Sequence, residues 1–143
     1  LRSNVQSTSL GVEQLQLVCH PDLKATVEAE TANGVITDFI SYDRPSTTYR
    51  HIQHFFNKQS IRTKTRLYST SPGVMLGMVL SGKGCAVLPL HLCEPYIQSG
   101  ELSPVLDKIQ RPLVVIQPPQ STLPDSLVNF IKMSRELLLE QIR

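Results

Sequence analysis

The stretch from Ser69 to Leu90, S-T-S-P-G-V-M-L-G-M-V-L-S-G-K-G-C-A-V-L-P-L, decides the fold, because it contains a turn, a helix and a buried strand. Ser71 is predicted to cap a helix that begins at Pro72, and Gly82 is placed for its left-handed end. The apolar run 85–88 is typical of a buried parallel strand. Amides and hydroxyls at such a helix start can bind an anion, although capping alone explains an isolated motif more simply.

Outward from this stretch, strands alternate with helices. The pattern predicts strands over 14–19, 38–42, 63–69, 86–88, 101–106 and 112–117, and helices over 46–57, 72–81, 91–98 and 124–142. Such alternation is typical of βαβ units around a parallel sheet. Right-handed crossovers then bring the helix starts to the carboxyl edge of the sheet, where ligands bind in open α/β folds. Two hydroxyl-rich starts, Ser46-Thr47-Thr48 and Ser69-Thr70-Ser71, are therefore predicted to face one cleft.

Composition indicates an ordinary globular chain: 41% of its 143 residues are hydrophobic, 18% are charged, and the formal net charge is +2. That charge is too small to indicate nucleic-acid binding, and no apolar run approaches the roughly 20 residues that span a bilayer. Arg62, Lys64 and Arg66 alternate along one predicted strand. We interpret them as the charged protection of a sheet edge rather than as a phosphate-binding patch.

The cysteines and histidines give weak indications of chemistry. Three cysteines without a C-x-x-C motif favour a reducing compartment. Cys93, in a polar segment, is a candidate reactive thiol, and a Cys85–Cys93 redox pair is a less favoured alternative. His51 and His54 could supply half of a metal site, but no third ligand is evident and a solvated pair is favoured. No motif of nucleophilic, zinc or phosphate chemistry is present, so no catalytic residue, metal or cofactor is predicted.

The order of several motifs resembles the effector-binding domain of LysR-type transcriptional regulators. These motifs are F-I-S-Y at 39–42, Ser46 through Arg50, Phe55, the stretch from Thr70 to Pro89, G-E-L-S-P-V-L at 100–106 and R-P-L-V-V-I at 111–116. The resemblance covers essentially the whole chain beyond Gln14. It implies an α/β fold of the periplasmic-binding-protein type (type 2), with Rossmann-like subdomains, mixed but mainly parallel sheets and a small-molecule inducer in the cleft between them.

Within the resemblance, four positions match the family's V-x-x-G-x-G-x-x-x-x-P pattern: Val79, Gly82, Gly84 and Pro89. Ser46 with Arg50 matches the S-x-x-x-R start of the second subdomain. Inducer contacts in the family cluster at two helix starts, so the resemblance implies that the ligand-binding residues are Ser46, Thr47, Thr70 and Ser71.

The resemblance also implies a division of the chain. Residues 1–37 would be the end of the first subdomain and a hinge, with a hinge passage in the polar stretch 24–37. Residues 38–110 would be the second subdomain, and residues 111–143 the returning hinge strand, which breaks near 117–119, and the final helix. The winged helix-turn-helix and most of the first subdomain would lie upstream of Leu1, so the sequence is expected to be a fragment.

The expected partners are an anionic inducer and further copies of the chain, as a homodimer or higher homo-oligomer. DNA would be reached only through the missing winged helix-turn-helix; no membrane is involved, and the location is cytoplasmic. Two alternatives stay open, a solute-binding protein of a transport system with the same cleft and an α/β enzyme. Without its usual partner subdomain, the final helix is predicted to pack on strand 14–19 or on a second copy, through Leu127, Phe130, Ile131, Leu137 and Leu138.

Overall fold

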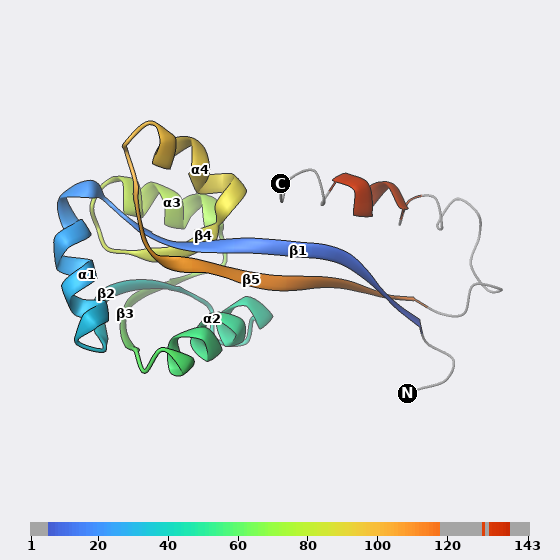
Figure 1. The fold of residues 1–143 in the computed structure, drawn as a ribbon, viewed down its shortest axis with the longest axis horizontal. Coiled ribbons are helices and arrows are strands. Elements are labelled where there is room, and N and C mark those ends of the chain that lie inside the picture. Colours follow the sequence, from blue (N-terminus) through green and yellow to red (C-terminus); the bar gives the residue numbers. More distant parts are fainter. Residues whose placement is uncertain (1–5, 118–129, 131, 138–143) are drawn as a thin grey trace. The chain divides into compact units, whose positions relative to one another are not determined.

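The computed structural model describes residues 6–117, 130 and 132–137. Its elements, labelled in Figure 1, are β1 (Gln6–Cys19), a 3-10 helix (Pro21–Leu23), α1 (Lys24–Ala32), β2 (Val35–Tyr42), α2 (Thr47–Lys58), β3 (Arg62–Ser69), α3 (Pro72–Leu80), β4 (Ala86–Pro89), α4 (Leu90–Gln98) and β5 (Ser103–Gln117). The chain divides into two compact units, Leu1–Gln14 with Gln110–Arg143 and Leu15–Ile109. The second unit contains the predicted ligand-binding residues.

Two groups of strands form the sheet structure of this unit. Strands β2 and β3 pair in parallel, and β1 lies between β4 and β5 with β4 antiparallel to it. A single parallel bridge between Phe39 and Cys85 joins β2 to β4. The expected mixed sheet structure is therefore present. The run 85–88, predicted as a parallel strand, is parallel only at the Cys85 bridge, and its residues 86–88 pair antiparallel with β1.

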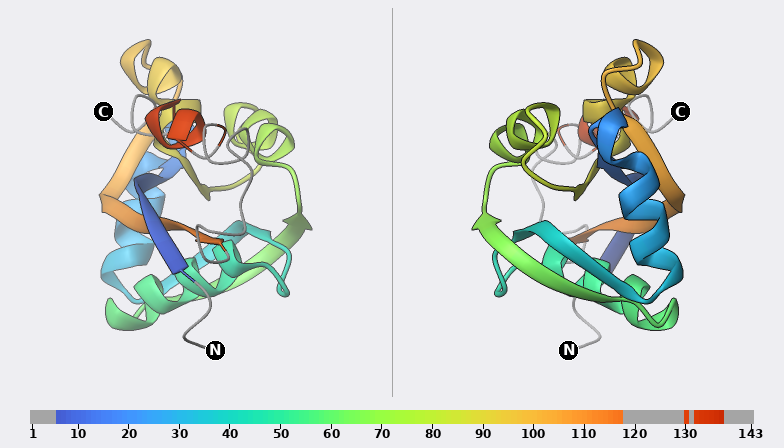
Figure 2. Two further views of the ribbon diagram at one scale, coloured as in Figure 1. Left: turned by 90° about the vertical axis from the view of Figure 1, so that its right-hand side faces the viewer. Right: turned by 90° about the vertical axis from the view of Figure 1, so that its left-hand side faces the viewer.

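The helices cover both faces of these strands. Figure 2 shows α2 on one face and α3 and α4 on the opposite face. This arrangement follows from the connections, because α2 carries the chain outward from β2 to the edge strand β3 and α3 carries it back to β4. Because such crossovers are right-handed as a rule, a reversal of direction along the sheet moves the connecting helix to the other face.

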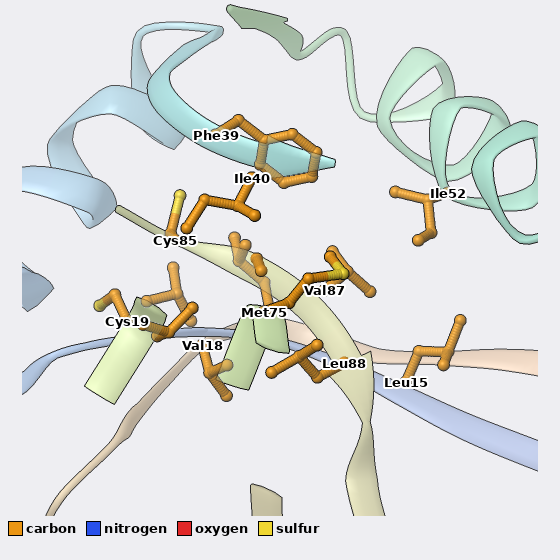
Figure 3. Packing of buried hydrophobic residues seen from close by; sticks show 14 of the residues in the cluster. Leu15, Val18, Cys19, Phe39, Ile40, Ile52, Met75, Cys85, Val87 and Leu88 are labelled. Carbon is orange, nitrogen blue, oxygen red and sulfur yellow. The ribbon is translucent and has the colours of Figure 1, made fainter. Parts of the chain in front are cut away.

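A core of fully buried apolar side chains holds the layers together (Figure 3). Phe39 of β2 and Phe56 of α2 meet edge to face with ring centroids 5.6 Å apart. On the α3 side, Met75 is completely buried, as is Leu88 of β4. Burial of side chains of this size contributes about 1.5–3 kcal/mol each, so the core fixes the positions of both helices.

Most predicted elements are confirmed, but the sequence analysis predicts no helix in the polar stretch 24–37, where the structure has α1 and the start of β2. In α1 only Val27 is buried, so a single apolar position joins the helix to the core. The sequence of α1 therefore lacks the helical spacing of apolar residues by which a helix is recognised. The compact unit spans Leu15–Ile109, and the expected division at residues 38 and 110 stays a prediction.

The two short strands predicted over 101–106 and 112–117 form the single strand β5. Leu106 within it has a φ of 65°, an irregularity that the sequence does not reveal. Next to it, the buried side-chain amide of Gln16 donates hydrogen bonds to the carbonyl oxygens of Val105 (3.0 Å) and Leu106 (3.1 Å). This amide tethers β1 to β5 beside the irregularity.

The final predicted helix lies only partly within the described residues. Residues 130 and 132–137 are helical, with Phe130, Met133 and Leu137 at least 60% exposed. Leu127, Ile131 and Leu138 lie outside the described residues, so the packing of this helix stays a prediction. None of the helices described is long and apolar enough to cross a membrane.

Candidate functional site

The two predicted helix starts lie at the same edge of the β2–β3 pair. Tyr42, the last residue of β2, is the register partner of Ser69, the last residue of β3. From these paired ends the chain needs only four residues to reach α2 and two to reach α3. The parallel register therefore brings the starts of both helices to one edge, as the sequence predicts.

Ser46 caps α2 from this edge. Its Oγ accepts a hydrogen bond of 2.9 Å from the amide of Tyr49, and its extended backbone is typical of a cap. Thr47 follows as the first helical residue and is exposed; its Oγ1 accepts a 3.4 Å hydrogen bond from the guanidinium of Arg50. Arg50 also donates to the carbonyl oxygen of Pro45 at 3.3 Å, which holds this cation at the helix start.

Ser71 caps α3 in the same way, as predicted. Its Oγ accepts a 3.2 Å hydrogen bond from the amide of Val74, while its own amide donates to Oγ of Ser69 at 3.1 Å. Thr70 between them is exposed. The capping hydroxyls of Ser46 and Ser71 are therefore used as acceptors within the chain. Thr47 and Thr70, at the same edge, are exposed to solvent.

This arrangement suits an anionic or strongly polar ligand. The first-turn amides of a helix have no acceptor within the helix, and the helix dipole adds positive potential there. Arg50 adds a full positive charge beside α2. The structure thus gathers Ser46 and Thr47 at one helix start and Thr70 and Ser71 at the next, with donors from both helices at one edge.

Arg44 and Tyr68 form a feature close to this edge that the sequence analysis does not single out. The Arg44 guanidinium donates to the phenol oxygen of Tyr68 through Nε (3.1 Å) and a terminal nitrogen (2.9 Å), and lies 5.2 Å from the ring centroid. The hydrogen bond from Arg44 lowers the pKa of Tyr68. Nothing in the local sequence indicates this pair, because its two members are 24 residues apart and meet only through strand pairing.

The pair borders a polar groove of about 440 Å³ between α2 and β3, whose lining includes Arg44, Tyr49, Gln53, Arg62, Thr63 and Tyr68. None of the four predicted ligand-binding residues lines it. Its floor follows β3, the outer strand of its pair, whose Arg62, Lys64 and Arg66 are all exposed. This confirms the interpretation of these cations as the charged surface of a sheet edge.

The cysteines contradict the expectation of a reactive thiol. All three are buried and free. Burial raises the pKa of Cys93 to about 11 and that of Cys85 further, so neither is a thiolate at neutral pH. Cys93, which the sequence offers only as a candidate, belongs to the buried core cluster. In the described part of the chain, no group of three or more His, Cys, Asp and Glu side chains could hold a metal ion.

The chain matches one protein family and is similar to several solved structures. The family model described as "LysR substrate binding domain" matches residues 1–139. No curated protein matches. Among solved structures, the apo regulatory domain of HypT from Salmonella typhimurium aligns with a TM-score of 0.74 at 17% identity, over 95% of this chain and 66% of that one.

Two further structures carry ligands. The regulatory domain of Synechocystis PCC6803 CcmR in complex with 2-PG aligns with a TM-score of 0.71 at 17% identity, covering 94% of this chain and 67% of that one. Full-length LysG from Corynebacterium glutamicum with bound effector Arg aligns with a TM-score of 0.73 at 12% identity, covering 97% and 48%. The chain thus spans about two thirds of the regulatory domains and about half of the full-length regulator, and at these identities the likeness establishes the fold.

Proposed function

Because the chain belongs to the family of LysR substrate-binding domains, we propose that it senses a small effector for a LysR-type transcriptional regulator. The pairing of Tyr42 with Ser69 is the observation that supports a binding site at this edge, since it brings two capped helix starts together. The ligand-contacting residues are Ser46, Thr47, Thr70 and Ser71. In this proposal the exposed threonine hydroxyls contact the ligand, while the serine hydroxyls accept the capping hydrogen bonds and donate their own protons to the ligand.

The proposed effector is a small anion. Relatives in this fold were solved with different ligands, 2-PG in CcmR and Arg in LysG, so the family does not fix the charge of the effector. Here the dipoles of two helix starts and the guanidinium of Arg50 favour negative charge. No described carboxylate is paired with Arg50, which leaves its charge available to a ligand.

The proposed mechanism is a shift in population between two arrangements of subdomains. A ligand that contacts both stabilises the closed arrangement only by its higher affinity for that arrangement. The rest of the regulator would supply the facing subdomain and an N-terminal DNA-binding domain, and it would work in the cytoplasm as a homodimer or higher homo-oligomer. In this scheme residues 38–110 act as the second subdomain, with hinges toward either end of the chain.

The test uses the full chain with inorganic phosphate and a panel of small mono- and dicarboxylates, followed by calorimetry. Thr70→Val should weaken binding about tenfold or more, because a hydrogen bond to a charged ligand is worth about 1.5–3 kcal/mol. Thr70 does not cap α3, so this variant should keep the stability of the parent. Thr26→Val, an exposed threonine on α1, is the matched control and should bind normally. Equal affinities in parent and Thr70→Val would remove Thr70 from the site.

The two alternatives from the sequence receive less support. The family match favours a regulator over a solute-binding protein of a transport system. The same match favours a regulatory domain over an enzyme. We therefore propose a binding role without catalysis.

A further inference from the structure

The polar groove bordered by Arg44 and Tyr68 contains side chains that neither the core nor the proposed effector site uses. We call it the α2 groove, because it lies between α2 and β3; α3 covers the opposite face of the sheet (Figure 2). Its volume of about 440 Å³ falls within the range of small-molecule sites. None of the four proposed effector-binding residues lines it, so the two sites are distinct.

The lining of the α2 groove is rich in hydrogen-bond donors. Two arginines, two tyrosines and two threonines line it, together with the side-chain amides of Gln53 and Asn57. Among the described residues that line it, none is acidic and none is aliphatic. A molecule that fits has to present many acceptors, because an apolar body would leave these donors without partners.

Arg44 supplies a positive charge of fixed orientation at one end of the groove. Its guanidinium donates two hydrogen bonds to the phenol oxygen of Tyr68, at 3.1 Å and 2.9 Å, and lies 5.2 Å from the ring centroid. Because this partner is a phenol and not a carboxylate, it orients the cation without cancelling its charge. A side chain held in this way loses little further freedom when an anion binds.

Arg62, the first residue of β3, supplies a second positive charge toward the other end. Hydrogen bonds from Arg44 and, to a smaller extent, from Thr65 lower the pKa of Tyr68, so the phenol reaches back along the strand to Thr65. Thr65 and Arg62 are three residues apart, which is about 10 Å along a strand. In the described part of the chain no carboxylate lies within 4.0 Å of either arginine. The groove therefore carries two separated, unbalanced positive charges.

From this combination we propose that the α2 groove binds a small polar molecule with a phosphate group at each end. One phosphate would bind Arg44 and the other Arg62, since a guanidinium fork matches two oxygens of one phosphate. The hydroxylated middle of the molecule would lie along Thr63 and Thr65 and face Gln53. A molecule with one anionic group fits less well, because it can reach only one of the two arginines.

Glucose 1,6-bisphosphate has this form and serves as the probe. Calorimetry with the full chain at low ionic strength should show saturable binding of one molecule per chain. Glucose 6-phosphate lacks one phosphate and should bind about tenfold more weakly or less, because it loses the charged hydrogen bonds at one end. Equal affinities for the two sugars would overturn the proposal, and so would the absence of binding by the bisphosphate at millimolar concentration.

Substitutions of single residues locate the site. Arg44→Gln and Arg62→Gln each remove one charged end, so each should weaken binding of the bisphosphate about tenfold and abolish its advantage over glucose 6-phosphate. Lys64→Gln removes an exposed cation of β3 that does not line the groove, and it should leave the affinity unchanged. An equal loss in Lys64→Gln would indicate a general charge effect and overturn the proposal.

Thr70→Val separates this site from the proposed effector site. Thr70 does not line the α2 groove, so the variant should bind glucose 1,6-bisphosphate as the parent does. A loss of binding in Thr70→Val without a loss in Arg44→Gln would place the bisphosphate at the helix starts and contradict the proposal. Normal binding in Thr70→Val supports the α2 groove whatever the outcome of the effector experiment.

Discussion

The carbonyl oxygen of Asp38 occupies the place where a side chain on Gly84 would begin. At this crossing the backbone amide of Cys85 donates to the carbonyl oxygen of Asp38 (3.2 Å). The amide of Ile40 donates in turn to the carbonyl oxygen of Cys85 (2.8 Å). Asp38 itself has a φ of 52°. The bridge that joins β2 to β4 therefore depends on a glycine at position 84, and it sets the position of the candidate site against the rest of the sheet.

Gly84→Ala is expected to destabilise the protein by about 3 kcal/mol or more, because the new methyl group meets backbone atoms that cannot move aside. Urea unfolding measures the change. Gly77→Ala is the control; it enters open space on a helix and should stabilise the protein by up to about 1 kcal/mol. Similar unfolding midpoints for the two variants would contradict the role of the Asp38–Gly84 crossing.

Removal of the caps should cost stability separately from ligand binding. Ser46→Ala and Ser71→Ala each remove an acceptor for a first-turn amide and should lower the free energy of unfolding by about 1 kcal/mol. Thr70→Ala, which removes a hydroxyl without a capping role, should change it by less than about 0.5 kcal/mol. A loss in Thr70→Ala as large as in Ser71→Ala would show that the capping hydroxyl has been misassigned.

Gln16→Leu tests the tether between β1 and β5. The Gln16 side-chain amide is buried and donates to two carbonyl oxygens of β5, so its replacement removes a donor from both acceptors. The expected loss is about 1–3 kcal/mol in chemical unfolding. Gln98→Leu, an exposed glutamine at the end of α4, should change stability by less than about 0.5 kcal/mol. If both variants unfold alike, the tether contributes nothing measurable.

Stability should fall at alkaline pH through the buried thiols. Burial raises the pKa of Cys19 and of Cys93 from 9.0 to about 11. Below pH 9 both folded and unfolded chains keep these protons; between pH 9 and 11 only the unfolded chain loses them. Each thiol then lowers the free energy of unfolding by about 1.4 kcal/mol per pH unit. Urea titrations of Cys93→Ala should show a shallower decline across this window, and an unchanged slope would count against a buried, protonated Cys93.

The Arg44–Tyr68 pair can be checked by NMR titration of the Tyr68 ring. The hydrogen bond from Arg44 lowers the pKa of this phenol, so Arg44→Gln should raise it toward the ordinary value of 10.0. Arg62→Gln removes another cation from the same groove without touching the phenol, and it should have a much smaller effect. Equal shifts in the two variants would indicate a general charge effect rather than a direct contact.

Local chemistry made much of the fold predictable. Ser46 and Ser71 cap helices, Pro72 begins α3 and Gly82 ends it with a φ of 78°, because each residue type favours that backbone position whatever surrounds it. The same reasoning did not find α1. Its contact with the core rests on Val27 alone, so its sequence resembles that of a polar linker.

By itself, the sequence determined where most helices and strands begin and end, the alternation that makes an α/β fold, and the hydroxyl groups at two helix starts. Tertiary structure alone decided which residues meet. Three of these contacts join segments that are distant in sequence: Tyr42 with Ser69, Arg44 with Tyr68, and Asp38 with Gly84. The burial of Cys93 likewise depends on how distant segments pack. Caps and turns are set by neighbours along the chain, whereas register, burial and charge pairing are set by packing across it.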